Sequence, residues 1–325
     1  EKAEAKAEET TETKAEETTE TKTEEEKKEG EGEEARVKAK SSAISCNTHT
    51  EEHEPEKKAE SNALELFTGE HLKDLDLKTF LMNPAPKGKL IQCHIIRDKG
   101  GLFSNTKYTL HLSHHPVFLM AGKKQSGNTT SNFAVCMNDK DISKKGPGYI
   151  GKVRGNFSGT EYHIYDDGAN PKKKGAKEGK KLREELGGVK FEMGAAGSTV
   201  APRKMTAVIP EVKPDGGILH FQPKTEKESM LVSHAAGHKE GIITCVSKNP
   251  SWNEKAKAFV LNFNGRVKKA SVKNFQLAPE TDMDKVVLQF GRVDDNNFIM
   301  DFQYPLSPFQ AFALCLSSFD SKFEQ

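Results

Sequence analysis

The residues best suited to bind a ligand are two short runs of basic side chains at the ends of apolar segments. Lys123 and Lys124 directly follow an apolar run, and Lys152 and Arg154 share one face if their segment is a strand. An arginine guanidinium can hold a phosphate with two hydrogen bonds, whereas a lysine acts as a point charge. If the two segments are neighbours, these side chains converge on a phosphorylated ligand. The alternative is that they are ordinary solvated side chains at strand ends.

A second basic run lies within 171–183, which holds seven Lys or Arg residues, among them Lys172, Lys173 and Lys174. Three interpretations stay open: a solvated insertion, a membrane contact, or a nucleic-acid contact. The run has no interleaved aromatic residue for base stacking and no helix-turn-helix or finger spacing, which weighs against nucleic acid. A smaller basic patch with the same alternatives consists of Lys268, Lys269 and Lys273.

Motifs for catalysis are missing from the sequence. His234 and His238 are four residues apart, but the Glu of a His-Glu-x-x-His metal site is absent, and two histidines alone do not make a site. There is no Gly-x-Ser-x-Gly elbow, phosphate-binding loop or dinucleotide fingerprint. We therefore expect no catalytic residues, no metal and no cofactor, and we expect that the protein is not an enzyme.

Charge divides the chain of 325 residues into two unlike parts. Residues 1–60 hold 20 Glu, no Asp and 11 Lys or Arg, a net charge of −9, and the remainder has a net charge of +10. The octapeptide at 6–13 is repeated identically at 14–21, without any apolar stripe. Such a composition buries too little apolar surface to offset the entropy of ordering. We predict a disordered acidic low-complexity tail over 1–62 and a folded domain over 63–325.

The folded part is dominated by short β-strands separated by Gly, Asn, Asp and Pro clusters. An entry segment with helical character is expected over 63–86, and a further helix near 180–187. Strands are expected at 90–97, 107–112, 116–121, 132–137, 148–154, 160–165, 188–193, 204–209, 217–222, 241–246, 257–263, 270–277, 285–291 and 297–303. So many strands without alternating helices indicate a mainly β protein, either a sandwich or a closed barrel.

The C-terminal segment favours the barrel. Seven of the eight residues at 309–316 are apolar, so a helix there is apolar on every side and must be buried all round. It is too short to cross a bilayer. A barrel of roughly a dozen strands has an interior too wide for its own side chains to fill. We therefore predict a closed antiparallel barrel over 88–304, built around a central helix within 305–322.

Several motifs, in order and spacing, resemble the C-terminal domain of the tubby family. They lie at 84–88, 149–154, 202–205, 260–267, 270–276, 289–293, 310–313 and 317–322. The resemblance extends over about 80–325 and implies a closed twelve-stranded barrel around a C-terminal helix. It also implies binding of phosphoinositides, above all phosphatidylinositol 4,5-bisphosphate, by Lys123, Lys124 and Arg154, with Lys152 as a further candidate. Lys172, Lys173 and Lys174 are a candidate secondary patch.

The same resemblance implies an adaptor that is recruited to the inner leaflet of the plasma membrane from the cytoplasm. Candidate partners are the intraflagellar transport complex and membrane receptors carried as cargo, and candidate locations include the cilium and the nucleus. The expected state is a monomer. The alternative function is a nucleic-acid-associated transcription regulator that uses the basic patches. One departure is that relatives carry a dense basic run after Lys124, whereas this chain has the uncharged residues 125–130, which predicts weaker long-range attraction to membranes.

Overall fold

A computed structural model describes residues 64–101, 105–114, 117–172, 181–192, 204–254 and 258–320. The acidic tail predicted over 1–62 lies outside the described residues. The described part is mainly β, as expected, with one principal sheet and a C-terminal helix. Among these residues no helix is long and apolar enough to cross a bilayer.

Twelve antiparallel strands close into a ring, which confirms the predicted barrel. The order around the ring is β2-β15-β14-β13-β10-β9-β8-β7-β6-β5-β4-β3, and the pairing of β3 with β2 closes it. The short strand β1 adds to β2 in parallel from outside the ring. The strands of the sheet are β1 (Glu65–Phe67), β2 (Lys89–Asp98), β3 (Lys107–Leu112), β4 (Phe118–Lys124), β5 (Asn132–Cys136), β6 (Tyr149–Gly155), β7 (Glu161–Asp166), β8 (Glu185–Phe191), β9 (Met205–Pro210), β10 (Ile242–Ser247), β13 (Phe275–Pro279), β14 (Leu288–Arg292) and β15 (Asn297–Phe302).

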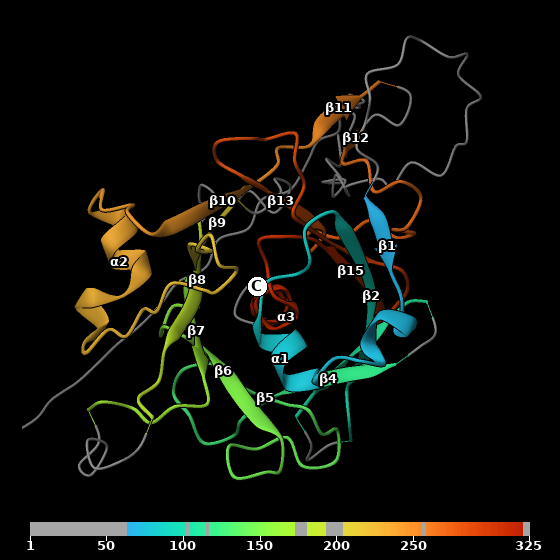
Figure 1. The fold of residues 1–325 in the computed structure, drawn as a ribbon. Helices are drawn as coiled ribbons and strands as arrows, with labels where there is room; N and C mark the ends of the chain where they lie inside the picture. Colours follow the sequence, from blue (N-terminus) through green and yellow to red (C-terminus); the bar gives the residue numbers. More distant parts are fainter. Residues whose placement is uncertain are drawn as a thin grey trace, which may run out of the picture. The chain divides into compact units, whose positions relative to one another are not determined.

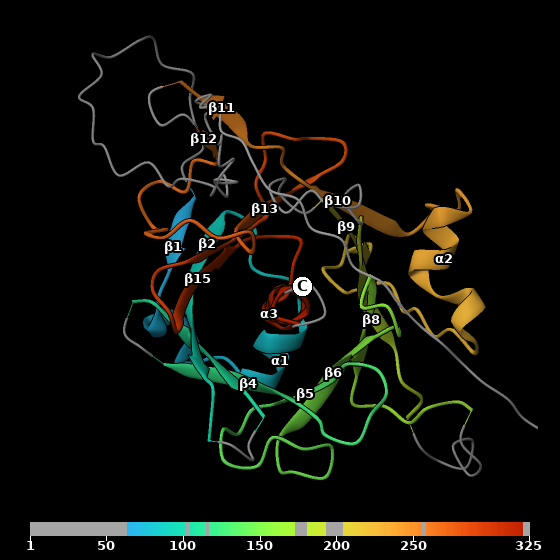
Figure 2. The ribbon, with the colours of Figure 1, turned by 180° about the vertical axis from the view of Figure 1, so that it is seen from behind.

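The helix α3 (Pro308–Ser318) lies inside this ring, as both views show (Figures 1 and 2). Every residue of α3 is buried, which is the environment that an all-apolar helix requires. Its start is well defined: Ser307 Oγ accepts a hydrogen bond from Gln310 N at 3.1 Å, and Gln310 Oε1 accepts one from Ser307 N at 2.8 Å. This reciprocal capping satisfies two backbone donors that would otherwise be buried without partners.

Inward-facing glycines let the helix approach the barrel wall. A Cβ atom added to Gly122 would lie 2.7 Å from Leu316 Cδ1, and one added to Gly151 would lie 2.5 Å from Phe309 Cζ. Real Cβ atoms do not come that close, so β4 and β6 need glycine where they face α3. These two strands also carry the predicted binding residues, and their position is therefore set directly by the central helix.

Smaller elements lie around the ring and, in the case of the helix α1 (Leu77–Met82), across its opening (Figure 1). The helix α1 contacts α3, and α2 (Met230–Ala235) packs on β8 and β9. Two 3₁₀ turns, η1 (Gly69–Leu72) and η2 (Glu226–Glu228), precede these helices. The hairpin of β11 (Ser251–Asn253) and β12 (Ala258–Val260) forms a separate two-stranded sheet.

Two local predictions were wrong, and a third was confirmed only in part. The helix expected near 180–187 does not form over the described residues 181–187, where Leu182 makes an isolated bridge to Ala169 and Glu185 begins β8. Residues 217–222 form only one isolated bridge, between Ile218 and Val212. The strand expected at 257–263 contributes β12, which pairs outside the barrel. In addition, β4 extends to Lys124, three residues past its predicted end, so both of its lysines belong to the strand.

Candidate functional site

The strand register places Lys123 and Lys152 in one row across three strands. Lys123 is paired with Ala134 across β4 and β5, and Ala134 is paired with Lys152 across β5 and β6. Residues opposed across a ladder share a face, and neighbouring strands lie about 4.8 Å apart. The two lysine Cα atoms are therefore separated by about 10 Å, two strand spacings. Lysine side chains can span this gap and contact one phosphorylated ring from two sides.

The alternation along β4 shows which of its lysines points outward. Gly122 faces α3, where an added Cβ would meet Leu316. Ala121 instead belongs to a small apolar cluster separate from the main core. Because side chains alternate between the two faces, Lys123 points outward with Ala121, and Lys124 points inward with Gly122.

Arg154 shares the outer face because it lies two residues beyond Lys152 on β6. It is exposed, and its side chain makes no hydrogen bond or ion pair with the residues that the structure describes. Its cross-strand neighbour is His163, whose Nδ1 lies 2.6 Å from Glu185 Oε1. The other oxygen of Glu185 accepts a hydrogen bond from Met230 N at 2.9 Å. That carboxylate is engaged by other partners, and the guanidinium remains available to a ligand.

A cation–π contact with Tyr165 positions the neighbouring Lys152. Lys152 Nζ lies 5.6 Å from the ring centroid of Tyr165, and the guanidinium of Arg183 lies 4.0 Å from the same centroid. Burial, followed by the nearby Glu185 carboxylate, raises the pKa of Tyr165 to about 12. Tyr165 therefore stays neutral at physiological pH, and its ring attracts cations without adding a negative charge to the site.

Lys124, the fourth predicted binding residue, has a partner inside the barrel. Its Nζ donates to Asp320 Oδ1 at 2.9 Å, and the hydroxyl of Tyr162 donates to Asp320 Oδ2 at 2.8 Å. Burial by itself raises the pKa of Asp320, but the hydrogen bonds from Lys124 and Tyr162, with the nearby Ser131 hydroxyl, outweigh it and lower the pKa below its ordinary value. The structure thus brings Lys123, Lys152 and Arg154 together on the outer face and places Lys124 in a network that ties the chain after α3 to the wall.

The predicted secondary patch lies elsewhere. Lys172 is exposed and follows the C-terminal end of β7, away from the turn that connects Arg154 to the next strand. Lys173 and Lys174 lie outside the described residues. The structure does not bring Lys172 to the outward row formed by Lys123, Lys152 and Arg154.

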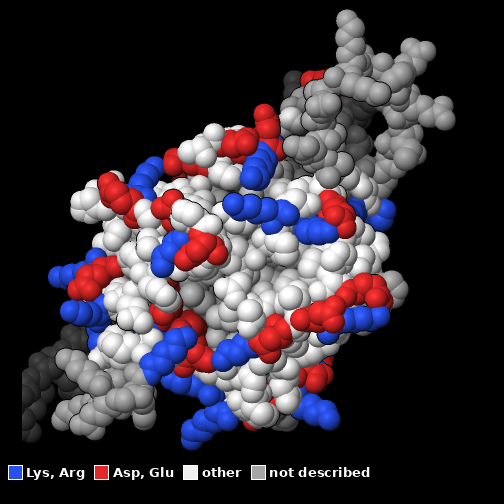
Figure 3. Space-filling view, in the orientation of Figure 1, with Lys and Arg blue, Asp and Glu red and all other residues white. Residues whose placement is uncertain are grey.

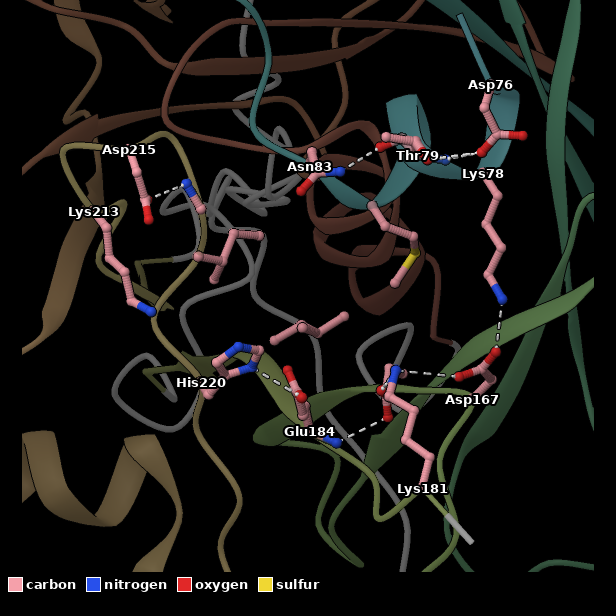
Figure 4. A pocket seen from close by; sticks show the side chains of 15 residues that line it. Asp76, Lys78, Thr79, Asn83, Asp167, Lys181, Glu184, Lys213, Asp215 and His220 are labelled. Atoms are coloured by element: carbon pink, nitrogen blue, oxygen red, sulfur yellow. Dashed lines mark hydrogen bonds and ion pairs between the residues drawn. The ribbon is translucent and has the colours of Figure 1, made fainter.

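A pocket of about 520 Å³ lies beside α1, next to the C-terminal end of β7 (Figure 4). Several of its charged side chains pair with one another: Lys78 Nζ lies 2.9 Å from Asp167 Oδ2, and His220 Nδ1 lies 3.0 Å from Glu184 Oε1. Acidic and basic side chains are interspersed over this face of the domain (Figure 3). Within the described ranges there is no group of three or more His, Cys, Asp or Glu that could hold a metal ion. These ion pairs leave little charge to attract a ligand, so we assign the pocket no binding role.

Comparison with known proteins decides the family. Residues 81–321 match the family model described as the Tub family. The chain belongs to the tubby family. It is 42% identical to Tubby-related protein 2 of Mus musculus over 255 residues, which cover 76% of this chain and 45% of that protein. It is 41% identical to Tubby-related protein 3 of Mus musculus over 253 residues, 76% of this chain and 55% of that protein.

A more distant relative gives the same assignment. Protein king tubby 1 of Aedes aegypti is 37% identical over 256 residues, which cover 76% of this chain and 60% of that protein. The chain spans about half the length of the first two relatives. The tubby assignment therefore concerns the domain, and the functions of the longer relatives do not follow from it directly.

In this tubby domain, sequence reasoning missed two features of the site. The first is that Lys123 and Lys124 point to opposite faces of the sheet. Extending the predicted strand 116–121 to Lys124 would have shown this, because side chains alternate between the two faces. The second is Phe157, an exposed aromatic residue in the turn directly after Arg154. Its signal was an aromatic residue between Asn156 and a Ser-Gly pair, in a position where turns are usually polar.

Proposed function

We propose that this tubby domain binds phosphoinositides, with a preference for phosphatidylinositol 4,5-bisphosphate, through Lys123, Lys152 and Arg154. The observation that carries the proposal is the row of outward cations across β4, β5 and β6, which includes an exposed guanidinium. A guanidinium that can hold one phosphate bidentately, together with two lysines whose Cα atoms lie about 10 Å apart, suits a ring with two phosphates. Lys124 is left out of the binding set because Asp320 engages its ammonium.

The proposed role is binding and recruitment, not catalysis. Reversible capture of the lipid headgroup would hold the chain at the inner leaflet of the plasma membrane as an adaptor. Hydrolysis of the lipid would release it, as in other electrostatic switches. Transport of receptors, including transport into cilia, is the cellular process that we propose for such an adaptor, with the intraflagellar transport complex as a candidate partner.

Co-sedimentation with vesicles of equal surface charge tests this proposal. One set contains phosphatidylinositol 4,5-bisphosphate and the other only phosphatidylserine. We expect the wild type to prefer the first set and the double variant Lys152→Ala/Arg154→Ala to lose about 2 kcal/mol of binding free energy, roughly thirtyfold in affinity. The matched control is Lys144→Ala/Lys145→Ala, which removes the same charge from two exposed residues in the β5–β6 loop.

Equal binding to both vesicle sets, unaffected by the double substitution, would reject the proposal. The nucleic-acid alternative predicts instead a steep salt dependence without headgroup preference. In the basic patch near 268–273 that this alternative would use, Lys269 Nζ already lies 3.3 Å from Asp295 Oδ1. No observation among the described residues favours it over lipid binding.

A further inference from the structure

Phe157 is the most exposed large apolar side chain in the described part of the chain. It is 78% exposed, compared with 46% for Leu75, the next in order. It lies in the turn 156–160, which connects β6 to β7 and begins two residues after Arg154. Single exposed apolar residues are common on protein surfaces, so exposure alone assigns no role. The structure of the turn and the charges around it distinguish Phe157 from the others.

The turn holds Phe157 in a well-defined backbone. Asn156 Oδ1 accepts hydrogen bonds from Thr160 N at 2.9 Å and Glu161 N at 3.2 Å, and Asn156 N donates to the carbonyl of Glu161 at 2.8 Å. Gly159 adopts a φ of 76°, which favours glycine, and its N–H donates to the carbonyl of Asn156 at 3.3 Å. Backbone groups that are paired within the turn can enter a less polar environment at low cost.

The turns that follow β2, β4 and β6 at this end of the barrel are almost uncharged, whereas the β14–β15 turn at the same end carries Asp294 and Asp295. The hairpins β2–β3, β4–β5 and β6–β7 all turn here because the ring is antiparallel. The β4–β5 turn at 125–131 and the β6–β7 turn at 156–160 contain no charged residue. In the described parts of the β2–β3 connection, 99–101 and 105–106, the one charged residue is Lys99. The opposite end differs, since the loop 137–148 alone carries two Asp and three Lys.

Acidic side chains at the neighbouring strand ends are matched by lysines. Glu161 Oε1 lies 3.4 Å from Lys190 Nζ, and Asp98 Oδ2 lies 3.9 Å from Lys107 Nζ. The side of this end that carries Phe157 and the outward cations, with its uncharged turns, can therefore approach an anionic surface.

We propose that Phe157 inserts its ring into the interfacial region of a lipid bilayer while Lys123, Lys152 and Arg154 hold a phosphorylated headgroup. This inference rests on the proposed function and adds a second contact to the same surface. Phe157 lies three residues beyond Arg154, about 10 Å along an extended chain. Interfacial apolar groups enter about 5–10 Å into the boundary between headgroups and acyl chains. A headgroup held at Arg154 therefore leaves Phe157 within reach of that boundary.

The first test is Phe157→Ala, measured both with vesicles and with the free headgroup. Losing part of a phenylalanine burial should weaken binding to vesicles that contain phosphatidylinositol 4,5-bisphosphate by about tenfold. Affinity for water-soluble inositol 1,4,5-trisphosphate should stay unchanged, because the cations remain. Leu75→Ala, at the opposite end of the barrel, is the matched control and should leave both affinities unchanged. Equal vesicle affinity for Phe157→Ala and wild type would overturn the inference and leave headgroup binding intact.

The second test reports insertion directly. In Phe157→Trp, fluorescence should shift to shorter wavelength on vesicle binding and should be quenched by lipids brominated near the headgroup end of the chain. The wild type, with the single native tryptophan Trp252, gives the background. Vesicle binding without quenching of the new tryptophan would reject insertion while the proposed function stands. If the protein binds neither vesicles nor inositol 1,4,5-trisphosphate, the proposed function and the inference both fail.

Discussion

The substitution Lys124→Ala separates two roles for this lysine, one in stability and one in lipid binding. Its ammonium contacts the carboxylate of Asp320, whose side chain is 0% exposed, whereas the Lys124 side chain is 34% exposed. Removing one partner of a fully buried ion pair costs about 3–5 kcal/mol. Partial exposure of Lys124 screens the pair, and Tyr162 keeps its hydrogen bond to Asp320, so we reduce the expected loss of unfolding free energy to about 2 kcal/mol.

The loss should depend on pH in a defined direction. The pKa of Asp320 is lowered in the folded state, so this carboxylate contributes stability that is fully present above its unfolded pKa of about 4 and is lost as pH falls through the folded value. The difference in unfolding free energy between wild type and Lys124→Ala should therefore be greatest near neutral pH and should shrink below about pH 4. Urea unfolding followed by circular dichroism measures both.

Vesicle binding of the same variant, measured well below its unfolding temperature, completes the test. We expect Lys124→Ala to bind vesicles with phosphatidylinositol 4,5-bisphosphate as the wild type does, apart from a small loss of general attraction. Lys144→Ala is the control, because it removes an exposed lysine from another loop and should change neither property. Wild-type stability combined with loss of headgroup selectivity in Lys124→Ala would refute our assignment and restore Lys124 as a binding residue.

Two further predictions concern the barrel itself. Gly151→Ala should lower the unfolding free energy by about 1–3 kcal/mol, because its added Cβ would clash with the carbonyl of Tyr165 and the ring of Phe309. Urea unfolding measures this loss, and an unchanged midpoint would contradict the close approach of α3 to β6. His94 and His111 stack with ring centroids 5.2 Å apart, and burial lowers the pKa of both. The stability that these neutral rings contribute is present above their unfolded pKa of about 6.5 and is lost as pH falls through the folded values. Between pH 7 and pH 5 the midpoint temperature of thermal unfolding should therefore decrease less in His94→Gln/His111→Gln than in the wild type.

The architecture could be predicted from sequence because one element required it. The segment 309–316 is apolar on every side, and a mainly β chain offers few places to bury such a helix other than the inside of a wide barrel. Alternating apolar residues also located most of the ring strands. The helix near 180–187 was wrong because two adjacent glutamates suggested a helix, whereas Glu185 is buried in β8 and bound to His163.

The binding row was predicted less completely. Residue types and period-two spacing placed Lys152 and Arg154 on one face, which the structure shows. The pairing of Lys123 with Ala134 depends on strand register, and the partner of Lys124 lies 196 residues away in sequence. Contacts of that kind come from closure of the barrel around α3, and no local pattern in the sequence encodes them. Phe157 was missed because its significance depends on which turns share one end of the ring.

Titration of the domain with water-soluble inositol 1,4,5-trisphosphate tests the central claim most directly, because it removes the membrane from the measurement. The three proteins to compare are wild type, Lys152→Ala/Arg154→Ala and the charge-matched Lys144→Ala/Lys145→Ala. We predict saturable binding with one site per domain in the wild type and the control, and a loss of roughly thirtyfold in the first double variant. Equal affinities in all three proteins would contradict the assignment of the headgroup site to the outward row on β4, β5 and β6.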